Sequence, residues 1–528
     1  MPLGYHSIVL HAHLPYIRHP EYESFLEENW LFEAITETYV PLLLMLARLQ
    51  AAGHKQCLTL SLSPTLMTML RDTFLQQRYL AHMDKLRLLA EQELQRTRND
   101  ETFAPLARLY YERLEEVVQV FDQQYNRDLI SAFAHFYNEG VLELITCAAT
   151  HGFLPLLKTE TSAVRAQLQV GAQTFKSMIG SSPKGVWLPE CGYFRGLEAI
   201  VEEAGFSYFF VDSHGILNAT PKPYYGLSAP LVCPNGVAAF GRDPDSSRQV
   251  WSRDEGYPGD ADYRDFYRDI GFDLDFDYIK PFILDGHTRI QTGFKYYRIT
   301  GPGTQKAPYD PARAHETIER HAEDFVSRSQ HAIGVHGGRV NPAPLIVSPY
   351  DAELFGHWWF EGLEWLEAVI CRMVKQPDLV ALTTPSAYLE KHHQLQSASP
   401  SASSWGDGGY NAFWLNPGND WIYPYLHDAA QRMNALVKQH NDAEPGTLRY
   451  RALQQAARSL LLAQASDWAF IMKSGTSQEY AYNRTRDHLA RFNYLEDAVH
   501  NDLIDERRLQ ALEIMDRVFP DISPQVFA

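Results

Sequence analysis

The sequence predicts an α/β protein built on a parallel sheet and followed by a helical region. Short apolar runs recur through the first part of the chain, and each ends in polar or ionisable residues. Amphipathic helical patterns separate several of these runs, and such alternation is typical of parallel sheets. The length of the alternating part favours closure of the sheet into a barrel. After about residue 396, the apolar positions repeat at helical spacing only.

Six apolar runs are predicted to form the strands. They are residues 7–13, 57–63, 185–190, 208–214, 332–338 and 345–351. The clearest helix between strands covers 195–205, where apolar residues repeat at helical spacing and Gly205 supplies a stop. A second amphipathic helix is predicted over 311–330, opened by Pro311. Chemistry in parallel barrels gathers at the carboxyl ends of the strands, and six ionisable residues fall there: His11, His13, Glu190, Asp212, His214 and Asp351.

Two regions interrupt the alternation of strands and helices. Residues 76–139 have helical patterns with charged faces and no strand, which predicts a helical insertion between early strands. The Ser-rich link at 396–404 is the best domain boundary in the chain. We therefore predict a catalytic barrel over 1–395, interrupted by the insertion at 76–139, and a helical C-terminal domain over 396–528.

Composition excludes some classes of partner. Among 528 residues, Lys and Arg number 47 against 65 Asp and Glu, a net charge of −18, and no basic cluster offsets it. Nucleic acid is therefore a poor partner, because binding to phosphates depends on clustered cations. The five cysteines form no CxxC pair, which fits a reducing compartment. The start of the chain lacks a basic leader, and apolar runs such as 41–49 are too short to span a bilayer. A cytoplasmic protein without a membrane partner is expected.

Two acids stand beside aromatic residues just after predicted strands. Glu190 lies within WLPECGY (187–193), and Asp351 lies within SPYDAELFGHWWFEG (348–362). Sugar-bond chemistry needs a nucleophile, a proton donor and flat faces for pyranose rings, and this pattern supplies all three. An acid partly desolvated by such rings keeps its proton more firmly, as a proton donor must. The structural alternatives are a capping or salt-bridged role for Glu190 and a helix N-cap for Asp351.

His11 and His13 are two residues apart, so on a strand both side chains point to the same face. They could contact sugar hydroxyls, form half of a divalent metal site, or hydrogen-bond at a barrel rim. Tryptophan in loops rich in Gly, Asn and Ser is less easily explained as core. Trp405 and Trp414 are therefore predicted to stack on sugars, whereas packing is an equally good explanation for Trp421.

Six motifs identify a family. They are HAHLP at 11–15, HGFLP at 151–155, WLPEC at 187–191, YDAELFGHWW at 350–359, SWG at 404–406 and SDW at 466–468. On these motifs the chain resembles the α-glucan-acting glycoside hydrolases of family 57, and within that family the 1,4-α-glucan branching enzymes. The resemblance covers nearly the whole chain.

The resemblance implies a fold, a mechanism and a set of site residues. The implied fold is an incomplete (β/α)7 barrel with a helical insertion and a helical C-terminal domain that closes over the cleft. The implied mechanism acts on α-glucan polysaccharide with retention and uses no metal or organic cofactor. By motif position, Glu190 is the nucleophile and Asp351 the acid/base. The residues implied to line the donor and acceptor sites are His11, His13, Trp30, His151, His357, Trp405, Trp414 and Asp467.

The chain departs from the family pattern in one loop. Branching members carry a tyrosine near the tip of a loop that helps to exclude water, but residues 228–252 contain no tyrosine. Its loss would shift the outcome toward hydrolysis, so an α-amylase-like hydrolase or a 4-α-glucanotransferase stays open. Two other classes also stay open: a metal-dependent amidohydrolase or deacetylase built on His11 and His13, and a non-catalytic glucan-binding protein.

Overall fold

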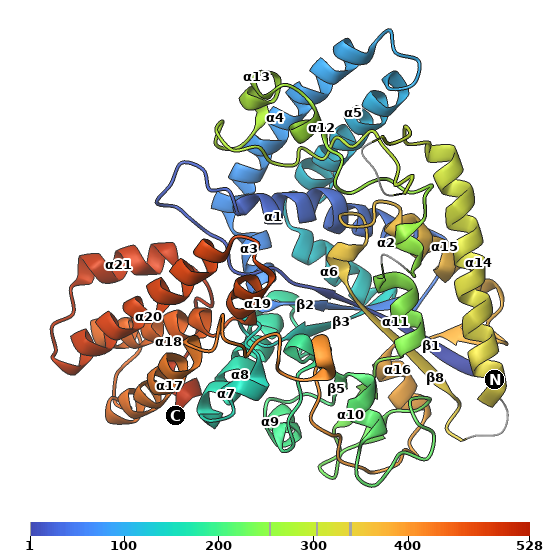
Figure 1. The fold of residues 1–528 in the computed structure, drawn as a ribbon. Helices are drawn as coiled ribbons and strands as arrows, with labels where there is room; N and C mark the ends of the chain where they lie inside the picture. Colours follow the sequence, from blue (N-terminus) through green and yellow to red (C-terminus); the bar gives the residue numbers. More distant parts are fainter. Residues whose placement is uncertain (1, 253–254, 302–304, 337–340) are drawn as a thin grey trace.

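A curled parallel sheet forms the centre of the molecule (Figure 1). The computed structural model describes residues 2–252, 255–301, 305–336 and 341–528. The strands follow the order β6-β7-β5-β4-β3-β2-β1-β8, with β9 beside the start of β1. Their bounds are β1 Gly4–Ala12, β2 Leu58–Leu62, β3 Leu142–Cys147, β4 Gly185–Trp187, β5 Tyr208–Val211, β6 Leu231–Val232, β7 Ala238–Gly241, β8 Leu345–Asp351 and β9 Val380–Leu382.

The sheet is an incomplete barrel, which corrects the closed barrel expected from the alternation alone. Eight strands run parallel, namely β1, β2, β3, β4, β5, β7, β8 and β9, and within the described residues no ladder joins β7 to β8. A backbone bond from Asp243 N–H to the Val347 carbonyl, 2.8 Å long, crosses this gap. The next residue, Pro244, has no N–H and begins helix α11 (Pro244–Trp251), so the chain turns away before a ladder can form.

Helices cover the sheet and fill the insertion. Before β4 they are α1 Glu28–Ala34, a π-helical turn η1 Ile35–Tyr39, α2 Val40–Ala51, α3 Pro64–Arg71, α4 Thr73–Thr97, α5 Ala104–Val118, η2 Gln119–Gln124, α6 Leu129–Asn138, α7 Leu154–Leu157 and α8 Thr161–Ile179. Residues 76–139 contain helices and no strand, as the sequence indicates. Asp72 begins α4 by accepting from the backbone N–H groups of Phe74 and Leu75.

The remaining helices include the whole C-terminal region. They are η3 Pro189–Cys191, α9 Leu197–Glu203, α10 Ser213–Leu217, α11, η4 Tyr257–Gly259, α12 Ile270–Asp273, α13 Phe276–Ile279, η5 Lys280–Phe282, α14 Pro311–His336, η6 Ala352–Leu354, α15 Gly362–Lys375, α16 Pro385–Lys391, η7 Asp407–Gly409, α17 Ile422–Gln439, α18 Leu448–Ala463, α19 Ser466–Ser474, α20 Gln478–His500, α21 Glu506–Met515 and η8 Pro524–Phe527. The division of the chain at 395/396 stays a prediction.

The strand predicted at 332–338 is wrong over its first five residues, which continue helix α14 to His336. The buried side chains Phe325, Ser329 and Ile333 recur every four residues, so the helical face extends past the predicted end at 330. Residues 337–338 lie outside the described residues. Strands β3 and β7 were not predicted; β3 carries an acid, Glu143, and ends in Cys147 instead of a polar residue.

One helical stretch in the described residues is long and apolar enough to cross a membrane by length and composition, and it runs from Glu28 to Ala51. The run at 41–49 is too short by itself to cross a membrane. Because α1 and η1 precede α2 without a break, the continuous helical stretch is longer. Of the most apolar window of this stretch, 72% is buried. Such burial is typical of a core helix, and this helix lies across the sheet in Figure 1.

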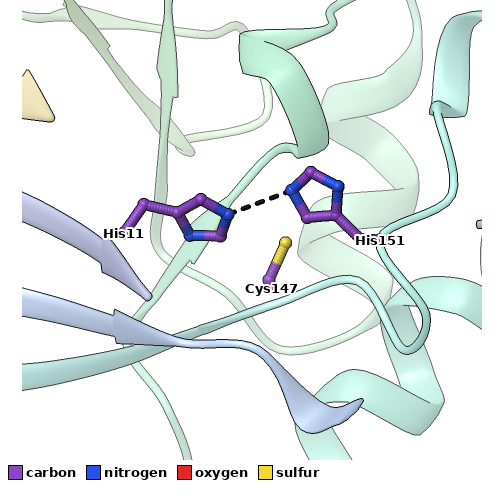
Figure 2. A group of neighbouring side chains, drawn as sticks. All are labelled: His11, Cys147 and His151. Carbon is purple, nitrogen blue, oxygen red and sulfur yellow. Dashed lines mark hydrogen bonds between the residues drawn. The ribbon is translucent and has the colours of Figure 1, made fainter. Parts of the chain in front are cut away.

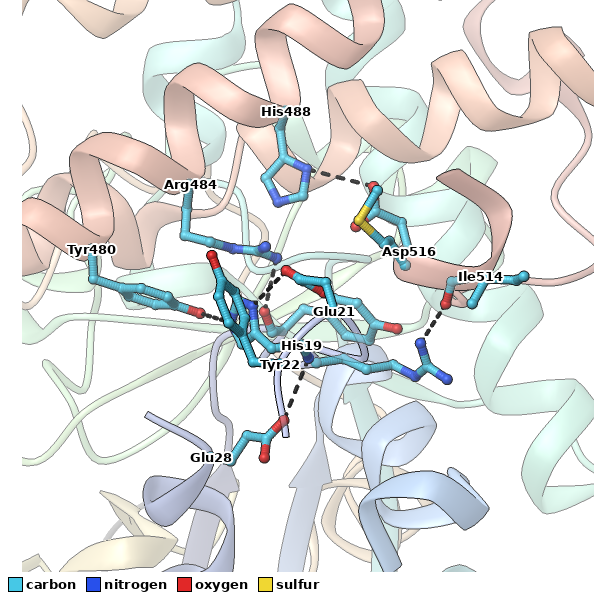
Figure 3. Close-up of polar contacts among 12 residues, drawn as sticks. His19, Glu21, Tyr22, Glu28, Tyr480, Arg484, His488, Ile514 and Asp516 are labelled. Carbon is cyan, nitrogen blue, oxygen red and sulfur yellow. Dashed lines mark hydrogen bonds and ion pairs between the residues drawn. The ribbon is translucent and has the colours of Figure 1, made fainter. Parts of the chain in front are cut away.

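The C-terminal helices dock on the loop that follows β1. His19 in this loop hydrogen-bonds through Nε2 to the Tyr480 hydroxyl of α20 at 2.9 Å, and Arg484 donates to the Tyr16 carbonyl at 3.3 Å. Figure 3 shows His19 enclosed between Tyr480, Arg484 and the end of α21. A second contact is an antiparallel bridge between Gly152 and Ala465. Together these contacts place the first turn of α19 at the carboxyl end of the sheet.

Candidate active site

Three neighbouring strands place side chains at one level of the sheet. His11 on β1 is in register with Ser61 on β2 and with Asp351 on β8. Parallel neighbours in register point to the same face, so the three side chains lie side by side at the carboxyl end of the sheet. The strand-end placement predicted for His11 and Asp351 is therefore what the sheet produces.

Glu190 sits on a turn that the sequence also indicates. Strand β4 ends at Trp187, and Pro189, Glu190 and Cys191 form one 3₁₀ turn. Glu190 has a φ of 61°, in the left-handed region that non-glycine residues rarely adopt. The turn is held by the Trp405 N–H, which donates to the Glu190 carbonyl at 3.0 Å. A strained backbone of this kind is common where a side chain must be aimed at a ligand.

The Glu190 carboxyl is buried and receives two hydrogen bonds. Trp405 Nε1 donates to Oε2 at 2.7 Å, and the Ser466 hydroxyl donates to Oε1 at 3.1 Å. Burial raises the pKa of Glu190 to about 7, although the bond from Trp405 opposes this change. The Asp467 carboxylate raises the pKa further. Glu190 thus binds its proton more firmly than an exposed glutamate does. Both of its donors in the described part of the chain are side chains, so the structure does not support a capping role.

The Asp351 carboxyl has a different environment. It begins the short helix η6 without capping it through its side chain, and no donor among the described residues bonds to it. Burial, reinforced by the negative charges of Glu353 and Glu190, holds the pKa of Asp351 well above its usual range, while Arg242 opposes them. Asp351 therefore holds its proton more firmly than an exposed aspartate does, and it interacts electrostatically with Glu190.

Three histidines form one network beneath these acids. His13 Nε2 lies 3.0 Å from Asp467 Oδ1, and His13 Nδ1 lies 2.9 Å from the Ser63 hydroxyl. His11 and His151 face each other with their Nε2 atoms 3.0 Å apart. Burial acts to lower the pKa of His13, but the Asp467 carboxylate outweighs it and the pKa is raised. Burial holds the pKa values of His11 and His151 well below their usual range, so both rings are neutral.

A chain of hydrogen bonds connects this network to Glu190, and each group in the chain donates to the next one. Because the Ser466 hydroxyl donates to Glu190, it accepts from His151 Nδ1, 2.8 Å away. His151 Nε2 then accepts from His11 Nε2, and His11 Nδ1 accepts from the Ser61 hydroxyl at 3.1 Å. This chain of donors assigns one tautomer to each neutral ring. It ends on Glu190, whose ionised form it favours.

Trp405 contributes both a donor and a ring face. Its indole packs edge-on against Trp187, with ring centroids 5.1 Å apart, and the Arg242 guanidinium lies 5.5 Å above it. Trp251, at the end of α11, is 46% exposed and lies with its ring 6.2 Å from that of Trp405. The Trp405 indole lies beside the Glu190 carboxyl, and its stacking on a sugar stays a prediction.

The structure corrects the prediction for Trp414. Its side chain is 1% exposed and stacks on Phe153 at 4.5 Å, so no ring face is open to a sugar. The prediction failed because it depended on loop composition, which does not distinguish Trp414, buried in the core, from Trp405, which lies at the site. Trp421, for which packing was the alternative, stacks on Tyr482 at 5.7 Å.

Two predicted residues have their contacts away from this network. His357 donates from Nδ1 to Glu37 Oε2 at 2.6 Å and lies 3.8 Å from Glu33. Burial acts to lower the pKa of His357, but the bond to Glu37 prevails and raises it. Trp30, on α1, packs edge-on against Tyr480 with centroids 6.0 Å apart. The structure thus unites His11, His13, His151, Glu190, Asp351, Trp405 and Asp467, and leaves Trp30 and His357 at separate positions.

Three residues that the sequence analysis left without a role support the site. Ser466 bridges His151 and Glu190. Glu353 accepts from the His13 backbone N–H at 3.2 Å and from the Tyr39 hydroxyl. Ser63 fixes His13, and the sequence contains a signal for it: Ser61 and Ser63 are two residues apart at the end of the β2 segment, as His11 and His13 are at the end of the β1 segment.

An open parallel half barrel with two buried carboxyl groups of raised pKa, set among aromatic rings, is typical of a carbohydrate-active enzyme. The chain belongs to glycosyl hydrolase family 57, whose sequence model matches residues 7–398. A second model, described as the C-terminal region of 1,4-alpha-glucan branching enzyme, matches residues 425–527.

Relatives of known structure agree with this assignment. The alpha-amylase AmyC of Thermotoga maritima is 43% identical, with a TM-score of 0.93 over 99% of both chains. A branching enzyme of Pyrococcus horikoshii is 31% identical, with a TM-score of 0.88 over 99% of this chain and 97% of its own. A 1,4-alpha-glucan branching enzyme of Thermococcus kodakarensis is 32% identical over 98% of this chain and 77% of its own length.

Proposed function

We propose that this protein is a retaining α-glucan transglycosylase that breaks α-1,4 links and forms α-1,6 branches. One observation carries the proposal. The segment that matches the branching-enzyme C-terminal model supplies Ser466 and Asp467, which bond to Glu190 and His13. The region described for branching enzymes therefore contributes directly to the candidate site and is not a separate appendage.

The first chemical step divides between the two acids. Asp351, whose pKa is raised by burial and by the negative charges of Glu353 and Glu190, donates its proton to the oxygen of an α-1,4 link. Glu190, in its ionised form, attacks the anomeric carbon, and a covalent glycosyl-enzyme forms. The bonds from Trp405 and Ser466 hold the Glu190 carboxyl in one orientation for this attack. The reducing-end part of the glucan leaves with the proton that Asp351 gave.

The second step reverses the roles. Asp351, now ionised, takes the proton from the 6-hydroxyl of an acceptor glucan, and that oxygen displaces Glu190. Two inversions at the anomeric carbon give net retention and an α-1,6 link. His11, His13 and His151 supply polar contacts for the sugar hydroxyls, and Trp405 supplies an aromatic face. A cytoplasmic role in the synthesis of a glycogen-like polymer belongs to this proposal.

A second candidate is α-amylase-type hydrolysis. Two observations favour it: the 43% identity to AmyC and the lack of a tyrosine in residues 228–252. In this case water takes the place of the acceptor 6-hydroxyl at the glycosyl-enzyme, and Glu190 and Asp351 keep their roles. A 4-α-glucanotransferase differs again, because the 4-hydroxyl of the acceptor attacks.

Incubation with amylose separates the three outcomes. A branching enzyme raises the number of α-1,6 links, measured by proton NMR or by debranching, with few new reducing ends. A hydrolase raises reducing ends alone, and a 4-α-glucanotransferase changes chain lengths without changing either number. An amylose sample without new α-1,6 links after prolonged incubation would overturn the first proposal.

A further inference from the structure

Two imidazoles of the site lie close to a fully buried thiol that makes no contact with the cleft. His11 Nε2 and His151 Nε2 lie 3.0 Å apart, and the ligand atoms of His11, Cys147 and His151 all lie within 4.8 Å of one another. Figure 2 shows the two rings facing each other, with the Cys147 sulfur beside the gap between them. We propose that these three residues bind a monovalent copper ion, Cu(I), and that the ion inhibits the enzyme.

The imidazoles already have the neutral charge that a metal ligand requires. Both rings are neutral, because burial keeps their pKa values low. The Nδ1 atom of each ring is held by a serine, His11 by Ser61 and His151 by Ser466, so each Nε2 points inward. Metal-bound histidines usually show this arrangement, with the second nitrogen fixed by a hydrogen bond.

Only small movements are needed. Bond lengths of about 2.0 Å to nitrogen and 2.3 Å to sulfur, as for a comparable ion, set ligand atoms roughly 3.3–3.8 Å apart. The imidazoles therefore separate slightly while the thiol approaches. To bind the ion, His11 must lose the proton on its Nε2 atom, and a proton is then carried by its Nδ1 atom instead. Ser61 can then accept from Nδ1 because its own hydroxyl has a second acceptor, the Thr146 carbonyl at 3.4 Å.

The donor set selects the ion. Two imidazoles and one thiolate make a three-coordinate, soft site, and these ligands suit copper in its reduced state. Zinc prefers four ligands, and no fourth protein ligand joins this group among the described residues. Burial raises the pKa of the Cys147 thiol, but a coordinated metal removes the proton. Binding therefore forms one Cu–S and two Cu–N bonds and releases one proton to solvent.

A second group of donors lies nearer the solvent but is not suited to hold the ion. His13, His151 and Asp467 also lie within 4.8 Å of one another. However, the His13 and His151 rings are stacked 3.9 Å apart at an angle of 12°, so their lone pairs run parallel and cannot meet at one ion. The partly exposed Asp467 and His13 would instead be the first contacts of an entering ion.

Inhibition follows from which residues the ion occupies. His11 and His151 would become metal ligands and could no longer bond to a sugar in the cleft. This consequence rests on the proposed function, whereas the binding of copper does not. A failure to find branching activity would therefore leave the copper site testable by itself.

The binding test uses the full-length protein under anaerobic conditions, with Cu(I) supplied by a coloured Cu(I) chelator that competes for the ion. The expected result is one high-affinity equivalent per chain, with one proton released, measured by calorimetry in buffers of different ionisation enthalpy. Cys147→Ser should weaken binding at least tenfold. Cys371→Ser, which alters a partly exposed thiol on α15, is the matched control and should bind copper as the wild type does.

Two further measurements keep the proposal falsifiable if a variant folds poorly. X-ray absorption of the wild-type complex should show one sulfur and two nitrogen neighbours. Metal-free Cys147→Ser should keep its activity on amylose and lose only the sensitivity to copper. Unchanged copper affinity in Cys147→Ser, or a spectrum without a sulfur neighbour, would overturn the site.

Discussion

The regions around Glu190 and Asp351 belong to one cleft but treat a carboxyl group in opposite ways. Around Glu190, the C-terminal part of the chain brings an indole N–H and a serine hydroxyl to the two oxygens. Around Asp351, the barrel brings the negative charges of Glu353 and Glu190, and no donor among the described residues. Donors stabilise an ionised carboxyl, whereas negative neighbours keep the proton on. Two similar side chains thus become suited to attack and to proton donation.

Removing either carboxyl group should have the largest effect on activity. Glu190→Ala and Asp351→Ala should each lower kcat on amylose by about 10³-fold or more, because each chemical step needs both groups. Azide should restore part of each rate by entering the vacated space. NMR of the products distinguishes the roles: a β-glucosyl azide from the Glu190 variant and an α-glucosyl azide from the Asp351 variant. Undiminished activity in either variant would contradict the assignment.

A smaller effect is expected from Trp405→Phe, which removes one donor to Glu190 and keeps a ring. Activity requires ionised Glu190, so it should fall as the pH drops through its pKa of about 7. Without the indole bond the pKa rises, and the acidic limb of the kcat/KM profile moves to higher pH. The rate at neutral pH should fall about 10-fold, as for the loss of a bond to a charged group.

Asp467→Asn should move the acidic limb of the kcat/KM profile to lower pH, opposite to Trp405→Phe, and should cause a smaller loss of rate. The Asp467 carboxylate raises the pKa of Glu190, so its removal lowers that pKa and extends activity to lower pH. His13 also loses the partner that raises its pKa. The kcat/KM profiles of both variants, measured in one buffer series, check this contrast. A shift in the same direction for both would show that Glu190 does not set the limb.

The smallest catalytic effect is expected from Trp414→Phe. Its indole N–H bonds to nothing among the described residues, and the ring is buried. The pH profile and the affinity for amylose should therefore stay as in the wild type. Trp414→Ala should instead lower the free energy of unfolding by about 3–5 kcal/mol, measured by chemical denaturation. If Trp414→Phe weakened glucan binding, the assignment of Trp414 to the core would be wrong and the residue would belong to the substrate site.

Much of the fold was predictable because strands and helices leave periodic patterns. The runs before His11, Glu190 and Asp351 are mostly apolar, and each acid or histidine follows directly. Failures occurred where a pattern was short or interrupted. Strand β3 contains Glu143, and the run at 332–336 is a helical face that continues past the predicted end of its helix.

The supporting residues of the site were harder to predict. Ser466 meets Glu190 across 276 residues of sequence, and Glu353 meets His13 across 340. The contact of Ser466 depends on how α19 docks beside the sheet, and that of Glu353 on the pairing of β8 with β1. Trp405 and Trp414 lie in one loop of similar composition, yet one donates to Glu190 and the other is core.

The sequence by itself determined which residue types stand at the strand ends, because alternation along a strand and the turn after it are local properties. Only the tertiary structure decided which of those residues share a network, which tryptophan reaches the acid, and which carboxyl keeps its proton. The physical reason is that a pKa and a hydrogen bond depend on neighbours in space, and most of these neighbours come from distant parts of the chain.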